Sequence, residues 1–311
     1  MRMDVPDLDV ASITAAVEAR AAATCGDDLA LAIRTLRRLP PARWALEWQL
    51  PWWLGRAWEL EPEVAEALVV GNVLGLVAIR LRDDLDDGEV PRDDVEGARR
   101  VSTVLFDAAL DAYRDRFQPT SPIWPFLDRA MAEFRHASDG RALHARRLGG
   151  RAAPLRIGAF AVCLLSGRSY ARSGLKACLD HALAALVRYD QVCDWEADLE
   201  AGRWNAFVAS LVDRPHDPEH RAANRSAVLA ALMTRGAART ELELVATDSA
   251  AAAHLAGRLG CAPLAAFLLD YASRASRQGE ALDAHYRMAA TTAAQIFFGG
   301  LVGRPTQEVR T

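Results

Sequence analysis

Two clusters of aspartate residues, far apart in the chain, carry its strongest chemical signal. They are the run Asp83-Asp84-Leu85-Asp86-Asp87 and the set Asp190, Asp194 and Asp198. Residues four apart in a helix lie one above another on the same face, so the second cluster predicts a column of carboxylates. Like charges placed in this way repel each other. A cation would offset that repulsion, and Mg²⁺ bound together with a phosphorylated ligand suits side chains that offer only oxygen.

The elements that must position these carboxylates are predicted to be helices throughout. Alanine is abundant, alternation of β-branched residues is nearly absent, and proline and glycine punctuate the apolar segments. We expect helices over residues 8–24, 27–38, 42–57, 62–87, 92–117, 123–138, 139–168, 173–212, 219–245, 248–259, 262–277 and 279–300. The predicted fold class is therefore all-α, and no repeat of fixed period indicates a solenoid.

Both acidic clusters lie on long helices that we expect to be buried. Residues 62–87 and 173–212 are apolar on most faces, and a helix that is apolar nearly all round belongs in a core. The longest apolar run, residues 67–79, is interrupted by Gly71 and Asn72 and is too short to cross a bilayer, so no membrane span is predicted. No linker rich in glycine, serine or proline divides the chain, which predicts a single domain over residues 1–311.

Charge and cysteine content narrow the class of protein. The formal net charge of -4 gives no general attraction to nucleic acid, so no nucleic-acid partner is expected. Five cysteines show neither a CxxC pair nor zinc spacing, which is typical of reduced thiols in a cytoplasm. The acidic, amphipathic N-terminus does not have the features of a signal peptide. These observations predict a cytoplasmic protein.

Each acidic cluster taken alone has a simpler interpretation, namely a charged surface in contact with water. A calcium-binding loop fits the first cluster poorly, because counting back from Gly88 places Leu85 at a position that must supply oxygen. A histidine-containing phosphohydrolase site also fits poorly, since none of the seven histidines has metal-ligand spacing. The presence of both clusters on helices expected to be buried favours a binding site.

The two clusters together resemble the aspartate-rich motifs of the class I isoprenoid synthase superfamily, which includes terpene synthases and polyprenyl diphosphate synthases. Asp83, Asp84 and Asp87 resemble its first motif, DDxxD. The segment Asp190-Gln191-Val192-Cys193-Asp194 resembles its second motif, with Gln191 in place of the usual second aspartate. Asp198 and the pair Gly202-Arg203 resemble the Asp and Gly-Lys that follow this motif in prenyl synthases. The resemblance extends over residues 62–210.

This resemblance implies a helical bundle of the isoprenoid synthase type with a central apolar cavity, and a cluster of Mg²⁺ ions as the cofactor. The implied metal ligands are Asp83, Asp84, Asp87, Asp190, Asp194 and Asp198, of which the first five are also the implied catalytic residues. The implied diphosphate-binding residues are Arg147, Arg151, Arg203 and Arg287. Magnesium and arginine forks would stabilise the diphosphate as it leaves, and an apolar aromatic pocket would shield the resulting carbocation.

The resemblance leaves a choice between two enzymes. Chain-elongating prenyl synthases need a second diphosphate site for isopentenyl diphosphate, and we find neither the Gly-Gly-Lys-Arg-like stretch nor the arginine pair that form it. We therefore expect a terpene synthase that ionises one linear prenyl diphosphate and cyclises or quenches the cation. A chain-elongating polyprenyl diphosphate synthase is the alternative. A catalytically silent helical partner protein is a remoter one, motivated by Gln191. The resemblance also suggests a homodimer.

Overall fold

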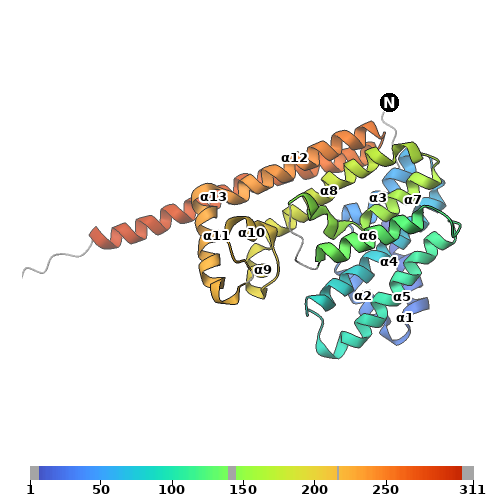
Figure 1. The fold of residues 1–311 in the computed structure, drawn as a ribbon, viewed down its shortest axis with the longest axis horizontal. Coiled ribbons are helices and arrows are strands. Elements are labelled where there is room, and N and C mark those ends of the chain that lie inside the picture. The colour runs from blue at the N-terminus through green and yellow to red at the C-terminus, as the bar shows by residue number, and fades with distance from the viewer. Residues whose placement is uncertain (1–6, 139–144, 216, 303–311) are drawn as a thin grey trace, which may run out of the picture.

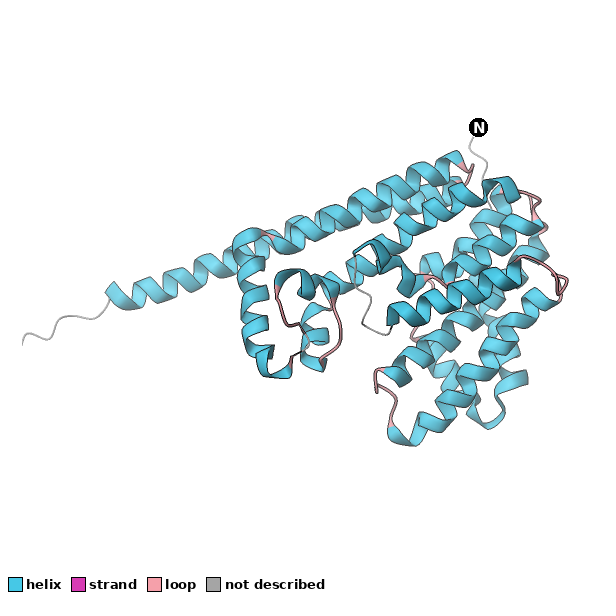
Figure 2. Ribbon diagram, in the orientation of Figure 1, coloured by secondary structure: helices cyan, strands magenta, loops and turns pink. Residues whose placement is uncertain are grey.

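The computed structural model describes residues 7–138, 145–215 and 217–302, and these residues form helices joined by short connections, with no strand among them (Figure 2). The all-α prediction is confirmed. The α-helices are α1 Val10–Cys25, α2 Leu29–Arg37, α3 Ala45–Ala57, α4 Pro62–Asp86, α5 Val95–Arg114, α6 Ile123–Ser138, α7 Leu155–Leu165, α8 Arg172–Cys193, α9 Trp195–Ala201, α10 Ala206–Leu211, α11 Arg221–Arg235, α12 Ala237–Arg258 and α13 Ala262–Val302. Five 3₁₀ segments lie between them, at Gly26–Asp28, Arg92–Asp94, Ala145–Ala152, Ser169–Ala171 and Pro218–His220.

Helix α4 is a central core element and carries the first aspartate cluster at its C-terminal end. Its Leu68, Leu74 and Leu81 are almost completely buried. Helix α5 crosses it closely at Gly71, where an added Cβ would lie 2.8 Å from the Cβ of Ala112. By length and composition α4 could cross a membrane, but 56% of its most apolar window is buried inside the protein. The burial expected for residues 62–87 is therefore present.

The second acidic cluster lies where a predicted long helix is broken. The helix expected over residues 173–212 is wrong as one element, because α8 ends at Cys193, α9 ends at Ala201, and α10 begins after Asn205. Gly202 adopts a left-handed conformation (φ 70°), which ends a helix, and the Asn205 side chain accepts a hydrogen bond from the backbone N–H of Val208, which begins one. Local capping thus overrides the apolar periodicity.

Other boundaries also differ from the sequence prediction. Where it is described, the helix expected over 139–168 is the 3₁₀ segment Ala145–Ala152 followed by α7. The helices expected over 262–277 and 279–300 form the single helix α13, since Gly279 lies inside it and lets it approach α12 closely. An added Cβ at Gly279 would lie 3.3 Å from the Cβ of Leu242. The break between α11 and α12 falls at Gly236, which has a positive φ, instead of near residue 246.

The buried apolar side chains form two clusters. The larger includes residues of α1–α8 and the neighbouring ends of α12 and α13. The smaller joins the end of α8 to α9–α11, the first half of α12 and the middle of α13. In Figure 1 the rods α8, α12 and α13 run side by side and connect the two parts, and α13 continues past the rest of the molecule. The first aspartate cluster belongs to the larger part, and the second lies where α8 enters the smaller part.

Candidate functional site

An arginine links the two aspartate clusters in space. Arg203 follows α9, and its guanidinium forms an ion pair with Glu89, two residues after Asp87. The same guanidinium pairs with Asp198 of the second cluster, with 3.0 Å between Nε and Oδ1. Segments more than one hundred residues apart in the chain therefore meet at Arg203, since Glu89 and Arg203 are 114 residues apart.

The three aspartates of the first motif have different surroundings. Asp84 is only 3% exposed and accepts from Arg38, with 2.8 Å between Nη1 and Oδ2, and from Arg80 at 3.5 Å. Asp83 is partly buried, and its nearest cation is Arg80 at 3.9 Å. Asp87 caps the end of α4 and is exposed to solvent. Asp84 is therefore already neutralised by protein cations, whereas Asp83 and Asp87 are available to a ligand.

The second motif shows the same division. Asp198 accepts hydrogen bonds from Arg203 and from the side-chain amide of Asn205, at 2.8 Å between Nδ2 and Oδ2. Asp190 and Asp194 have no such side-chain partner within the described part of the chain. The N–H of Asp194 donates to the carbonyl of Asp190 at 2.8 Å, and that of Asp198 donates to Asp194 at 2.9 Å. The helical succession of the three aspartates thus continues through the break after α8.

Gln191, which departs from the resembled motif, has a structural role. Its side chain is 4% exposed, and its Oε1 accepts from the backbone N–H of Ala206 at 2.9 Å. Its carbonyl accepts from the side-chain amide of Asn205 at 2.8 Å. Gln191 therefore ties α8 to the start of α10. An uncharged amide suits this buried position better than a carboxylate, because a carboxylate there would be desolvated.

The aspartates without close partners are held in an environment that opposes their ionisation. Burial raises the pKa of Asp83 to about 6, and the nearby Arg80 and Arg151 offset this only in part. Desolvation by the surrounding protein also raises the pKa of Asp87, Asp190 and Asp194, although these carboxylates remain accessible to water. The charge of Asp194 further raises the pKa of Asp190, and the charge of Asp198 raises that of Asp194. This donor set fits a divalent cation that prefers oxygen ligands.

Three charged residues near the motifs were missed by the sequence prediction. Arg80 lowers the pKa of Asp83 in the first motif and of Asp190 in the second, so its guanidinium acts on both motifs. The guanidinium carbon of Arg80 lies 5.7 Å from the ring centroid of Trp44. Arg43 lowers the pKa of Asp190 as well. The sequence gives only a weak indication of the role of Arg80. It precedes Asp83 by three residues and so lies on the same helix face.

Glu47 is the third residue and the most unusual acid near the site. It lies on α3 and is partly buried, and burial, with a smaller contribution from the charge of Asp190, raises its pKa to about 7. Its backbone carbonyl accepts a hydrogen bond from the side chain of Asn72. In the sequence Glu47 is the lone acid between Trp44 and Trp48, and this apolar surrounding could have predicted its partial burial.

The predicted diphosphate-binding arginines separate into three groups. Arg203 contacts both segments, and Arg151 acts electrostatically on Asp83 and Asp87. Arg287 instead pairs with Asp283 of its own helix, at 3.1 Å from Nη2 to Oδ2, and its contacts within the described residues do not include either motif. The side chain of Arg147 lies outside the described part of the structure.

A row of aromatic rings leads to the second motif. The ring centroids of Trp53 and Phe267 are 5.3 Å apart, those of Phe267 and Tyr271 are 6.1 Å apart, and those of Tyr271 and Tyr189 are 5.5 Å apart. Tyr189 directly precedes Asp190, and the charge of Asp190 adds to the burial that raises the pKa of Tyr271. These rings come from α3, α13 and α8, and they give the acidic site an aromatic side.

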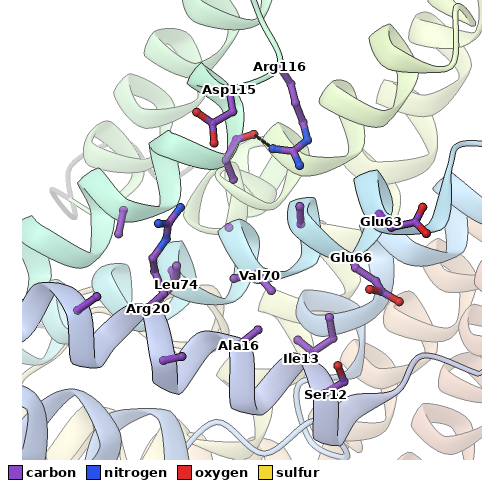
Figure 3. Close-up of a pocket in the computed structure, with 16 residues that line it drawn as sticks. Ser12, Ile13, Ala16, Arg20, Glu63, Glu66, Val70, Leu74, Asp115 and Arg116 are labelled. Atoms are coloured by element: carbon purple, nitrogen blue, oxygen red, sulfur yellow. Dashed lines mark hydrogen bonds between the residues drawn. The ribbon is translucent and has the colours of Figure 1, made fainter.

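One pocket lies away from both aspartate motifs. It has a volume of about 630 Å³ and lies between α1, α4 and α5, over the N-terminal half of α4 (Figure 3). Its walls are mostly small apolar side chains, with Arg20, Arg116, Glu63 and Glu66 at its edges. A second pocket of about 580 Å³ is lined by Trp204, Arg214 and their neighbours. Neither contains a predicted site residue, so the central apolar cavity stays a prediction.

Comparisons with known proteins add no identification. No protein-family model, no curated protein and no solved structure matches the chain significantly. Within residues 7–138, 145–215 and 217–302, no three His, Cys, Asp or Glu side chains are grouped closely enough to hold a metal ion by themselves. The contacts around the two aspartate motifs are therefore the basis for any functional conclusion.

Proposed function

We propose that this protein is a magnesium-dependent class I terpene synthase, which ionises a linear prenyl diphosphate and cyclises or quenches the resulting carbocation. One observation carries the proposal. Two aspartate motifs from distant parts of the chain approach each other across Arg203, and each contains carboxylates that the surrounding arginines do not neutralise. A purely structural network would pair its acids, as it does at Asp84, whereas Asp83 is left partly buried with a raised pKa.

The proposal divides the acids into two roles. Asp83, Asp87, Asp190 and Asp194 would hold the metal ions, while Asp84 and Asp198, held by their own cations and amides, fix the ends of α4 and α9. Because no three His, Cys, Asp or Glu side chains of the described residues are grouped around a single point, each ion would share oxygens of the diphosphate and water, as Mg²⁺ commonly does. Bound magnesium supplies charge stabilisation for the departing diphosphate.

Arginines and aromatic rings would complete the chemistry. The guanidiniums of Arg80, Arg151 and Arg203 act on the aspartates of the site, where they could donate to diphosphate oxygens. Breaking the carbon–oxygen bond leaves an allylic cation, which ring faces stabilise and water destroys. The row from Trp53 to Tyr189 offers such faces beside Asp190.

The test is a panel of geranyl, farnesyl and geranylgeranyl diphosphates, each with magnesium and with or without isopentenyl diphosphate. A terpene synthase forms a hydrocarbon or alcohol and releases diphosphate from one of them, without consuming isopentenyl diphosphate. Consumption of isopentenyl diphosphate with a longer diphosphate as product would establish chain elongation instead. If no substrate gives a product or releases diphosphate, both the terpene synthase and the chain-elongating synthase are excluded. That result would favour the catalytically silent partner protein.

A further inference from the structure

Helix α4, which carries the first aspartate motif, and helix α9, which carries Asp198, end in the same way. The first ends with Asp84-Leu85-Asp86-Asp87-Gly88-Glu89 and the second with Asp198-Leu199-Glu200-Ala201-Gly202-Arg203. The shared pattern is an aspartate and a leucine, two further residues, a glycine and then a charged residue. Both glycines have φ 70°, a conformation that favours glycine, so each chain leaves its helix through the same left-handed turn.

The hydrogen bonds of the two turns also correspond. The N–H of Glu89 donates to the carbonyl of Asp84 at 2.8 Å, and the N–H of Arg203 donates to the carbonyl of Asp198 at 2.8 Å. In each turn the glycine N–H donates to the leucine carbonyl, at 3.2 Å for Gly88 and 3.3 Å for Gly202. This helix-ending motif fixes the residue after the glycine against the aspartate that begins the pattern. The backbone of Glu89 and of Arg203 is thus held by the two motifs themselves.

The charged residues after the two glycines have opposite signs, and they meet. Glu89 accepts from Nη1 of Arg203, while Asp198 accepts from Nε. No hydrogen bond reaches Nη2 of Arg203 among the residues that the structure describes. The guanidinium also lowers the pKa of Asp87 and of Asp194, so it lies within electrostatic reach of an unpaired aspartate in each motif.

We propose that Glu89 is a positioning residue, which holds the Arg203 guanidinium between the two motifs so that Nη2 is presented to the diphosphate of the substrate. This inference rests on the proposed function and adds a residue that neither motif contains. Two acceptors on the planar guanidinium of Arg203 fix both its position and its plane. The side chain therefore loses less conformational entropy when an anion binds.

The opposite role for Glu89 makes a different prediction. If Glu89 merely competed with the diphosphate for Arg203, removing its carboxylate would free the fork and remove a repelling charge, and the anion would bind more tightly. A positioning role predicts weaker binding, and it predicts that the effect of Glu89 disappears when Arg203 is absent.

The experiment is a double-mutant cycle read by calorimetry, with inorganic diphosphate as the probe in saturating magnesium. Glu89→Ala should weaken diphosphate binding about tenfold, as expected for the loss of one charged hydrogen bond. Arg203→Ala should weaken it at least as much, and Glu89→Ala added to Arg203→Ala should have no further effect. Glu89→Gln, whose amide oxygen can still accept from Nη1, should recover part of the loss.

Asp94→Ala is the matched control, because it removes an acid from the same α4–α5 connection and breaks an exposed ion pair with Arg34. It should leave diphosphate binding unchanged. Equal binding by the wild type and Glu89→Ala, tighter binding by Glu89→Ala, or additive effects in the cycle would each overturn the positioning role alone. A wild-type protein that binds no diphosphate with magnesium would overturn the proposed function, and the positioning role with it.

Discussion

At the scale of single residues, the aspartates of the two motifs do not form one uniform set. Asp84 and Asp198 accept hydrogen bonds from protein side chains. The other four have no close ion-pair partner among the described residues, and of these Asp83 is partly buried while Asp87, Asp190 and Asp194 are exposed. The sequence predicted the motif positions, because spacing determines which residues share a helix face. It could not predict this division, because Arg38 and Asn205 reach the aspartates through tertiary contacts and not through spacing.

This division predicts opposite effects for neighbouring substitutions. Asp84→Ala should lower the free energy of unfolding by about 1–3 kcal/mol, because Arg38 and Arg80 lose their buried partner. Asp83→Ala should instead raise it at neutral pH, because the ionised Asp83 carboxylate is partly buried with its closest cation 3.9 Å away and its pKa is raised to about 6. Urea unfolding without magnesium measures both. Equal destabilisation by the two substitutions would contradict the division.

Glu47 predicts a pH dependence of stability. Its pKa in the folded protein is about 7 against an ordinary value of 4.5, so between these values the folded state binds more protons than the unfolded state. Stability should therefore fall as pH rises from about 4.5 to about 7, and then level off. Asp83, with a pKa of about 6, contributes with the same sign.

The check is urea unfolding across that pH window, in buffer without magnesium, for the wild type and Glu47→Gln. The variant should show a flatter curve and should be more stable than the wild type above pH 7. Glu59→Gln is a control, since Glu59 lies in the connection after α3 and is not near Asp190 in any contact described. Curves of equal slope for the wild type and Glu47→Gln would refute this account of Glu47.

At the scale of elements, periodicity predicted which segments are helical but not all of their ends. The break within 173–212 depends on Gly202 and Asn205, whose capping contacts reach Asp198 and Gln191. The continuity of α13 through Gly279 depends on its close approach to α12, which supplies a tertiary reason for a small residue inside a helix. Both outcomes come from contacts between elements, which a single sequence shows only indirectly.

The crossing of α4 and α5 gives a prediction at this scale. Gly71→Ala should destabilise the protein by about 1–3 kcal/mol, because the new Cβ would lie 2.8 Å from Ala112 and 3.2 Å from the backbone carbonyl of Ala109. This cost exceeds the gain of about 1 kcal/mol in helix propensity. Gly257→Ala in α12, where a Cβ meets nothing within 4 Å, should instead be stabilising. Chemical denaturation compares them, and a stabilising Gly71→Ala would disprove the close packing.

At the scale of the whole molecule, the acidic site lies at the junction of two hydrophobic clusters. The Glu89–Arg203 pair connects the end of α4 with the segment after α9, and α8 runs from one cluster into the other. A ligand bound by both motifs would therefore stabilise the junction. A cytoplasmic location and a homodimer remain predictions of the sequence.

This arrangement predicts synergy between magnesium and diphosphate in thermal unfolding. Each ligand alone should raise the melting temperature little. Magnesium alone has no diphosphate oxygens to complete its coordination, and diphosphate alone is repelled by the unpaired carboxylates. Together they should raise it by more than the sum of the separate shifts, since binding to the folded state alone adds stability. Additive shifts, or none, would show that the two motifs do not bind the ligands jointly.

The central claim is that Asp83 and Asp190, from opposite motifs, bind one metal–diphosphate ligand together. Calorimetry with an unreactive prenyl thiodiphosphate tests it most directly, in wild type, Asp83→Asn, Asp190→Asn and the control Asp94→Asn. We predict magnesium-dependent binding that each of the first two substitutions weakens at least about tenfold, and that Asp94→Asn leaves intact. Binding that is independent of magnesium, or that survives both Asp83→Asn and Asp190→Asn, would contradict the claim.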